Sequence, residues 1–357
     1  MLKLLDKIIF LISIIAMSGL AGAYASSYIN PNHFVYLSLL GLAYPYLLIS
    51  NLVLFLYWIV RWKKMAWAEL VIILSGIPAF MTYYGTADTE EKTQNYDFSV
   101  ISYNVRYFDF YNWSNQKNTK NKLFNYLKEF KGNIICLQEF TLQGNTSNEQ
   151  ALVRQLQAYP YRHIHKDMAI FSRLPIISKG HLSFGEQTSA SCLYCDVVTP
   201  VDTVRLYNIH LESYKLGKKE RQFMKEISQG IKTNDLPGSA KKLTSRLTTA
   251  NKNRAQQADQ IKRHLLQSPH QAIICGDFND TPLSYTYKKI KTNLKDAFIE
   301  KGRGLGNTYI GEFPSFRIDY ILHTPGLETV SYNRELIELS DHYPVKAKLK
   351  LKKKIHS

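Results

Sequence analysis

Charge is missing from the first part of this 357-residue sequence. No Lys, Arg, Asp or Glu occurs in residues 8–60, although charged residues make up 21% of the chain. A soluble core rarely needs so long an uncharged run, whereas two membrane crossings of about 20 residues each would fill it. Residues 65–85 predict a third, weaker crossing interrupted by Gly76 and Pro78. Glu69 lies near its basic end, where we expect the carboxylate to reach the membrane interface.

Positive charges predict how these crossings are oriented. Lys3 and Lys7 flank the first crossing, and Arg61, Lys63 and Lys64 separate the second from the third. Basic residues beside membrane crossings usually stay on the cytoplasmic side. We therefore expect a multi-pass cell-membrane protein whose chain after residue 85 lies on the extracytoplasmic side.

A signal peptide is a competing interpretation of the first apolar run. Lys3, Lys7 and the sequence Ala23-Tyr24-Ala25 are typical of one, with cleavage after Ala25. The two remaining crossings would still place the rest of the chain outside. A buried helical hairpin of a soluble protein is the third interpretation, which the length of the uncharged run disfavours.

Cysteine is scarce, and the four cysteines do not form a metal site. Cys192 and Cys195 have the CxxC spacing, but no second pair and no nearby His accompanies them. In an extended strand these two positions face opposite sides and lie roughly 10 Å apart, which is too far for a disulfide. Cys136 and Cys275 occur in apolar runs. We predict that all four are packing residues.

The excess of positive charge is concentrated in one segment. The chain carries a net charge of +16, and residues 214–264 hold thirteen Lys and Arg against four acidic residues. Such a surface attracts polyanions, either nucleic acid or the anionic head groups of lipids. A solvated surface that serves solubility is the alternative interpretation.

The rest of the sequence alternates between apolar strands and amphipathic helices. We expect strands at residues 98–103, 133–137, 168–172, 191–199, 202–211, 272–275, 315–322 and 345–351. Helices are expected at residues 118–131, 149–159 and 248–266. The predicted organisation is a membrane anchor (1–85), a polar linker (86–96), a globular domain (97–352) and a basic tail (353–357).

Polar side chains gather where the predicted strands end. The strand at 272–275 runs into Gly276 and Asp277, and Asn279 lies two residues further, on the same side of an extended chain. Taken alone, this segment is equally typical of an ordinary polar turn. Similar strand ends recur, however, and together they provide ten candidate site residues: Asn104, Arg106, Glu139, Asn208, His210, Asp277, Asn279, Asp319, Asp341 and His342.

The order of these motifs along residues 97–351 resembles that of the endonuclease/exonuclease/phosphatase superfamily. The motifs are SYNVR, CLQEF, NIHLE, CGDFND, RIDYIL and SDHYP. The resemblance implies an α+β fold, a four-layer α/β/β/α sandwich like that of DNase I. Two mixed sheets would pack face to face with helices outside and the active site at one end.

The resemblance also implies a divalent ion, Mg²⁺ or alternatively Mn²⁺. Magnesium takes hard oxygen ligands, keeps several waters and needs only one or two protein carboxylates. Glu139 would be the main metal carboxylate, with Asn104 beside it and Asp341 as a further ligand. The Asn-x-Arg spacing of Asn104 and Arg106 is similar to that of DNase I, and Arg106 and Asn208 would bind the substrate phosphate.

The remaining candidates are expected to handle protons and the charge on the phosphoryl group. Asp319 would fix the tautomer of His342, whose ring would exchange a proton with the attacking water or the leaving oxygen. Asp277 would orient or deprotonate water, so the general base is either Asp277 or His342. Asn279 and His210 would donate hydrogen bonds to the non-bridging oxygens.

The functional hypothesis is a membrane-anchored, Mg²⁺-dependent phosphodiesterase. Its substrate would be nucleic acid or the head group of a phospholipid or sphingolipid, since loops rather than the fold decide the substrate in this superfamily. The alternative is a non-catalytic module that binds polyanions and has retained the fold. The membrane bilayer is the other expected partner, and no protein partner is predicted.

Overall fold

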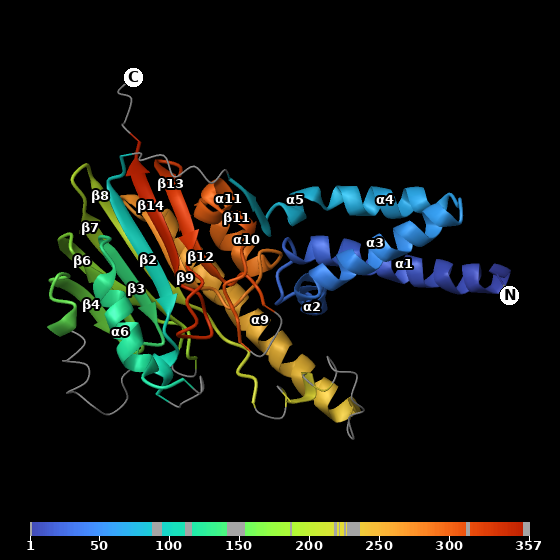
Figure 1. Ribbon diagram of the computed structural model, residues 1–357, viewed down its shortest axis with the longest axis horizontal. Helices are drawn as coiled ribbons and strands as arrows, with labels where there is room; N and C mark the ends of the chain where they lie inside the picture. Colours follow the sequence, from blue (N-terminus) through green and yellow to red (C-terminus); the bar gives the residue numbers. More distant parts are fainter. Residues whose placement is uncertain are drawn as a thin grey trace.

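Two six-stranded mixed β-sheets form the centre of the structure, a computed structural model (Figure 1). The first sheet contains, in spatial order, β13 (Leu327–Arg334), β14 (Val345–Leu351), β2 (Phe98–Asn104), β3 (Ile134–Gln138), β5 (Met168–Ser172) and β4 (Tyr161–His165). The second sheet contains β10 (Lys295–Asp296), β12 (Asp319–His323), β9 (Gln271–Asp277), β8 (Thr203–His210), β7 (Ser191–Val198) and β6 (Ile176–Leu182). Within these sheets β2 runs parallel to β3 and β8 parallel to β9, and the other ladders are antiparallel.

The structure describes residues 2–87, 95–110, 116–140, 154–185, 188–217, 220, 222–224, 226, 236–311 and 315–352. Most of the predicted linker (86–96), the beginning of the helix predicted at 149–159, part of the basic segment and the tail at 353–357 lie outside these ranges. Thr86, the first predicted linker residue, ends the short strand β1 (Tyr84–Thr86), which pairs with β11 (Arg303–Leu305).

Alternating side chains explain why the two sheets pack face to face. On β3, Ile134 and Cys136 lie in the core between the sheets, whereas Ile135 and Leu137 pack with residues of helix α6 (Thr119–Glu129) on the outer face. Cys275 of β9 belongs to the inner core. The predicted α/β/β/α sandwich is therefore confirmed.

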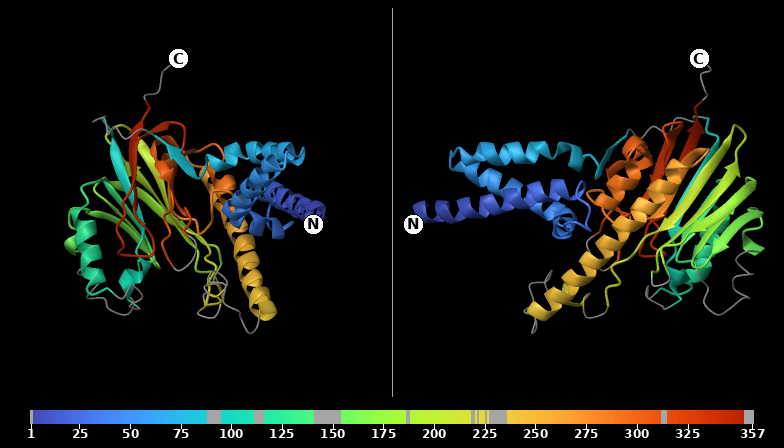
Figure 2. Two further views of the ribbon diagram at one scale, coloured as in Figure 1. Left: turned by 45° about the vertical axis from the view of Figure 1, so that its right-hand side comes forward. Right: turned by 180° about the vertical axis from the view of Figure 1, so that it is seen from behind.

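Helices α9 (Leu236–Leu266) and α10 (Tyr285–Lys291) cover the outer face of the second sheet (Figure 2). Ala258 and Ile261 of α9 pack there with Tyr207 and Ile274 of the sheet. The helix begins twelve residues before the predicted start at residue 248. Residues 237–247 of its early turns are all exposed or half-buried, so the sequence has no apolar stripe there that would predict a helix.

The cysteines behave as the sequence predicts. All four are buried and free. Cys192 packs in the outer core under α9 and Cys195 in the core between the sheets, so the two side chains lie on opposite faces of β7. Their role is packing.

The N-terminal segment forms five helices: α1 (Leu2–Ser26), α2 (Tyr36–Leu42), α3 (Tyr44–Val60), α4 (Met65–Ser75) and α5 (Ile77–Phe80). Among the described residues only the part of α1 at Leu4–Ser26 is alone long and apolar enough to cross a membrane. Helices α2 and α3 reach that length only as a pair bent by 69°. The prediction of three crossings is therefore wrong, because α4 ends after 11 residues, where Gly76 and Pro78 follow.

Helices α1, α3 and α4 project from the sandwich, with the N-terminus and the turn between α3 and α4 at the end far from the sheets (Figure 1). An ion pair of 3.0 Å between Arg61 Nη2 and Asp6 Oδ2 joins α1 to that turn. We expected the carboxylate of Glu69 to reach the membrane interface, but it does not reach the surface of the protein. Its side chain is buried in the helical segment, as are Ser13 and Trp58.

Candidate active site

The registers of three neighbouring strands align three of the candidate residues. His210 of β8 lies opposite Asp277 of β9, and Asp277 lies opposite Asp319 of β12. Gly276 precedes Asp277 with a φ of +136°, which L side chains rarely adopt. A Cβ atom there would lie 1.9 Å from the carbonyl oxygen of Ile209. The glycine therefore lets β9 deliver Asp277 beside β8.

We expect Gly276→Ala to destabilise the protein by about 3 kcal/mol or more, because the methyl group meets backbone and the φ is strained. Thermal unfolding followed by circular dichroism measures the change. Gly304→Ala is the matched control, since Gly304 also has a positive φ of 67° but nothing lies within 4 Å of the place that a methyl group would take there. Equal losses of thermal stability in the two variants would show that the positive φ alone, and not the contact with Ile209, destabilises the protein.

Asn104 links the ends of the two sheets. Its Nδ2 atom donates to Glu139 Oε1 at 3.3 Å and to Asp277 Oδ2 at 3.1 Å. Glu139 directly follows β3 in the first sheet, whereas Asp277 ends β9 in the second. Two carboxylates that are far apart in the sequence therefore meet at one amide group.

His342 and Asp319 form a buried pair. Nδ1 of His342 lies 2.9 Å from Asp319 Oδ2, which leaves Nε2 directed to Asp277 Oδ2 at 3.7 Å. Burial raises the pKa of Asp277 to about 6, an effect that the charge of His342 opposes. Burial disfavours the charged form of His342 as well, but the carboxylates of Asp319 and Asp277 raise its pKa to about 10. The pair thus holds the ring in one orientation beside Asp277.

Arg106 and Asp341 form an ion pair near these residues. Arg106 Nε lies 3.2 Å from Asp341 Oδ2, and Ser340 Oγ donates to Asp341 Oδ1 at 3.3 Å. Arg106, Glu139 and Asn279 all have a positive φ, of 45°, 51° and 53°. Left-handed backbone at non-glycine residues is uncommon and tends to gather at functional sites.

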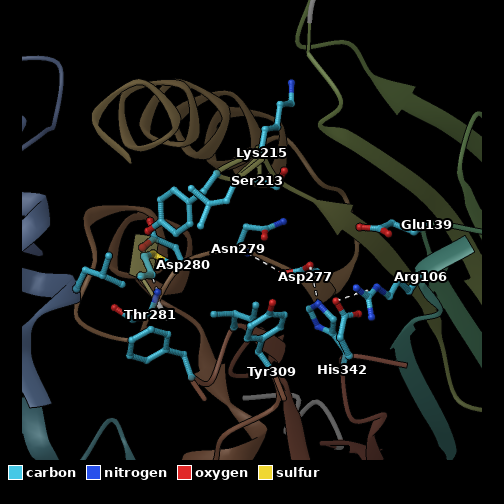
Figure 3. Close-up of a pocket in the computed structure, with 17 residues that line it drawn as sticks. Arg106, Glu139, Ser213, Lys215, Asp277, Asn279, Asp280, Thr281, Tyr309 and His342 are labelled. Carbon is cyan, nitrogen blue, oxygen red and sulfur yellow. Dashed lines mark hydrogen bonds and ion pairs between the residues drawn. The ribbon is translucent and has the colours of Figure 1, made fainter. Parts of the chain in front are cut away.

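These side chains border a cavity of about 220 Å³ (Figure 3). Six of the ten candidates line it: Arg106, Glu139, Asp277, Asn279, Asp341 and His342. Glu139, Arg106 and His342 lie at one end, and Asp280 and Thr281 at the other, beside the blue ribbon of the N-terminal helices (Figure 3). Asn279 lies between them, with its Nδ2 bonded to the carbonyl oxygen of Leu211 at 2.9 Å.

A model of the endonuclease/exonuclease/phosphatase family matches residues 101–342 of this chain. The chain belongs to this family. Its members hydrolyse phosphoester bonds, and so the chain is a hydrolase of that kind. A second model, described as a domain of unknown function, matches residues 6–83, which contain the N-terminal helices.

Solved structures share the fold of the family domain at low sequence identity. Danio rerio TDP2 complexed with a single-strand DNA product is 17% identical with a TM-score of 0.51, over 71% of this chain and 98% of that one. An endonuclease/exonuclease/phosphatase from Beutenbergia cavernae is also 17% identical, with a TM-score of 0.51 over 72% of each chain. The human Nocturnin catalytic domain with bound sulfate is 15% identical with a TM-score of 0.50, over 72% of this chain and 95% of that one. No curated protein sequence matches the chain.

Enzymes of the family use a divalent metal, and the residues at the polar end of the cavity fit one. Glu139 Oε1 and Asp277 Oδ2 both lie within 4 Å of Nε2 of His210, and neither ring nitrogen of this buried histidine has a hydrogen-bond partner among the described residues. The Glu139 side chain is 21% exposed, so an ion can reach it from the cavity. Hard oxygen atoms of this kind suit Mg²⁺ or Mn²⁺.

A different cluster, of Asp277, Asp319 and His342, also brings three ligand atoms, one from each residue, within 4.8 Å of one another. Within this cluster Asp319 Oδ2 is already engaged by His342 Nδ1 at 2.9 Å. All three of these residues are buried, whereas the Glu139 side chain is 21% exposed.

Asn208 does not contact the cavity, contrary to the expectation that it binds the substrate phosphate. Its Nδ2 donates to the carbonyl oxygens of Leu137 and Ala169, both at 3.0 Å, and its Oδ1 accepts from Gln138 at 2.6 Å. Asn208 therefore joins the two sheets one layer below His210. Asn208 lies two residues from His210, so the sequence places both side chains on the same face of the strand. The sequence does not indicate how far each lies from the cavity.

Tyr309 is a site residue that no motif predicts. It lines the cavity, forms an isolated β-bridge with His342, and its ring lies 5.3 Å from the His342 ring in an edge-to-face arrangement. Tyr309 lies outside any named strand, and nothing in the surrounding sequence marks it. Its contact is expected to hold the outer face of the imidazole.

Proposed function

We propose that this protein is a membrane-held phosphodiesterase that uses a divalent metal and water to cleave a phosphodiester. The observation that supports this best is the meeting of Glu139, Asn104, Asp277 and His342, from both sheets, at one end of a single cavity. A module that only binds polyanions would not need a carboxylate-oriented histidine beside a second buried carboxylate.

In the proposed reaction, a water molecule attacks phosphorus and the bond to the leaving oxygen breaks, which gives a phosphomonoester and an alcohol. Asp277 Oδ2 and His342 Nε2 lie 3.7 Å apart, so one water molecule can contact both atoms. One of the two accepts the proton of the water, and the proton ultimately reaches the leaving oxygen. Asp319 keeps Nε2 of His342 directed to this place.

Glu139 and Asn104 would hold the metal, and Asp341 is retained as a further proposed ligand. The bound ion would neutralise charge on the phosphoryl oxygens and so favour attack by water. Arg106 and the second amide hydrogen of Asn279 would donate to the non-bridging oxygens. His210 lies behind Glu139 and Asp277 rather than on the lining of the cavity, so we propose that it supports those two carboxylates.

The proposed attachment to a membrane is supported by exposed apolar side chains. Ile8, Leu11 and Ile15 of α1 are 51–65% exposed, and Val53 and Leu56 of α3 are both 60% exposed. A soluble monomer rarely exposes so much contiguous apolar surface. The basic residues near the N-terminus and after α3 lie at the end far from the sandwich, which supports our proposal that the catalytic domain is extracytoplasmic.

The metal is tested by removal and restoration. We expect EDTA to abolish hydrolysis of bis-p-nitrophenyl phosphate by the full-length protein in detergent, and Mg²⁺ or Mn²⁺ to restore it. Absorbance of released nitrophenolate measures the rate, and inductively coupled plasma mass spectrometry gives the metal content. Full activity in protein from which no metal can be detected would contradict the proposal.

Two substrate classes follow from the family domain and the anchor. TDP2 was solved with single-strand DNA, and Arg106 and the basic α9 are compatible with nucleic acid. The anchor and the apolar surface favour a phospholipid or sphingolipid head group. Hydrolysis of plasmid DNA compared with sphingomyelin vesicles, each with and without EDTA, separates the two classes.

A further inference from the structure

Helix α2 of the N-terminal segment forms part of the catalytic cavity. Leu42, the last residue of α2, lines the same cavity as Asp277 and His342. Leu216, Met224 and Phe316 line it as well. We call these four residues, Leu42, Leu216, Met224 and Phe316, the apolar wall. The N-terminal helices therefore contribute directly to the active site in addition to any role as an anchor.

Close backbone packing fixes α2 against the loop that follows Asp277. A Cβ atom on Gly41 would lie 2.6 Å from the carbonyl oxygen of Leu283, so only a glycine allows this approach. Ser26 Oγ at the end of α1 donates to the same carbonyl oxygen at 3.0 Å. Leu42 directly follows Gly41, and this contact places it at the cavity.

Polar bonds attach the helices to the catalytic domain at two more places. Asn251 Nδ2 of α9 donates to Ser38 Oγ of α2 at 2.7 Å. Arg317, whose side chain is 1% exposed, donates from Nη2 to the carbonyl oxygen of Thr82 at 2.9 Å. Hydrogen bonds of a buried charged group are costly to break, so these bonds stabilise the contact between the helices and the domain.

Among the described residues that line the cavity, the two cations, Arg106 and Lys215, each pair with a carboxylate. Arg106 pairs with Asp341, and Lys215 Nζ lies 2.6 Å from Glu212 Oε1. A nucleic-acid strand would need successive cations or stacking surfaces along its path. The described lining offers a reactive end that suits one phosphoryl group, the apolar wall, and Asp280 and Thr281 at the end beside the N-terminal helices.

We infer that the substrate is a phosphodiester with an apolar chain, as in a lipid, and that the chain lies against Leu42 of the apolar wall. This inference rests on the proposed phosphodiesterase function. Helix α3 continues from Leu42 with exposed Ile49 and Val53, so a bilayer around α3 would bring lipid chains to the wall. Burial of each methylene of the chain would strengthen binding at this position.

The test uses three p-nitrophenyl phosphodiesters that differ only in their second alcohol: methyl, hexyl and thymidine 5′. The full-length protein is assayed in detergent with Mg²⁺ and with Mn²⁺. We expect kcat/KM for the hexyl ester to exceed that for the methyl ester at least tenfold. Leu42→Ser should lower this hexyl-to-methyl ratio at least fivefold. Leu52→Ser is the matched control, because Leu52 is an exposed leucine of α3, and it should leave the ratio within twofold of the unmodified protein.

Leu42→Phe provides a second variant that keeps the wall apolar but narrows the cavity, and it should lower activity on the hexyl ester more than on the methyl ester. Equal losses on all three esters in the Leu42 variants would overturn the inference, as would a preference for the thymidine ester that these variants leave unchanged. Failure of the unmodified protein to hydrolyse any ester with either metal would instead refute the proposed function, and the inference with it.

Discussion

Glu139→Gln is expected to lower kcat/KM for bis-p-nitrophenyl phosphate by about 1000-fold, while the thermal unfolding temperature changes by only a few degrees. The amide keeps the shape of the side chain but removes the negative charge that holds the cation. Loss of several kcal/mol of charge stabilisation in the transition state corresponds to a factor of this size. The residual rate should depend on higher Mg²⁺ or Mn²⁺ concentrations than in the unmodified protein.

Glu328→Gln is the matched control for this experiment. Glu328 is an exposed residue of β13 opposite Lys350, so the same chemical change occurs away from the cavity. Its rate and metal dependence should equal those of the unmodified protein. A Glu139→Gln protein with full activity, or with reduced activity but unchanged metal dependence, would remove Glu139 from the metal site.

The sequence predicts the sandwich because its central strands carry simple patterns. Strands such as β3 and β9 are short apolar runs that stop at polar residues, and they appear within two residues of the predicted limits. The edge strands β6 and β13 were not predicted. Their residues are mostly half-buried or exposed, so neither a continuous apolar run nor a strict alternation distinguishes them from loops.

The candidate site is predictable to the extent that strand ends share one edge. The registers confirm this for His210, Asp277 and Asp319, which lie side by side on three strands. The distance of a side chain from this edge is not predictable in the same way. Asn208 and His210 lie on the same face of β8, but only His210 lies near Glu139.

The apolar wall lies beyond what local patterns can indicate. Leu42 meets Leu216 and Phe316 around one cavity, although more than 170 residues separate it from either of them. An apolar residue at the end of a helix predicts burial or membrane contact, and nothing local tells which cavity it borders. The charge-free run at residues 8–60 likewise predicts contact with a membrane. It does not predict where the helices break, and the number of membrane crossings depends on those breaks.

A last prediction concerns the pairing of His342 with Asp319. His342→Ala is expected to lower kcat about 1000-fold, and Asp319→Asn about 100-fold, since an asparagine at 319 keeps the size of the aspartate but removes its charge. The double variant should be no slower than His342→Ala alone, because Asp319 acts on the reaction through the imidazole. Rates for bis-p-nitrophenyl phosphate at saturating metal measure all three effects.

Asp296→Asn is an informative comparison, because Asp296 is another buried carboxylate that pairs with a cation, Arg317, at 2.8 Å. It should lower thermal stability while leaving kcat of the folded protein unchanged. Multiplicative losses in the double variant at 319 and 342 would mean that Asp319 acts independently of the histidine. We expect the two losses in kcat not to multiply. The 2.9 Å contact between Asp319 and Nδ1 of His342 directs Nε2 toward Asp277, so Asp319 has no effect once the imidazole is removed.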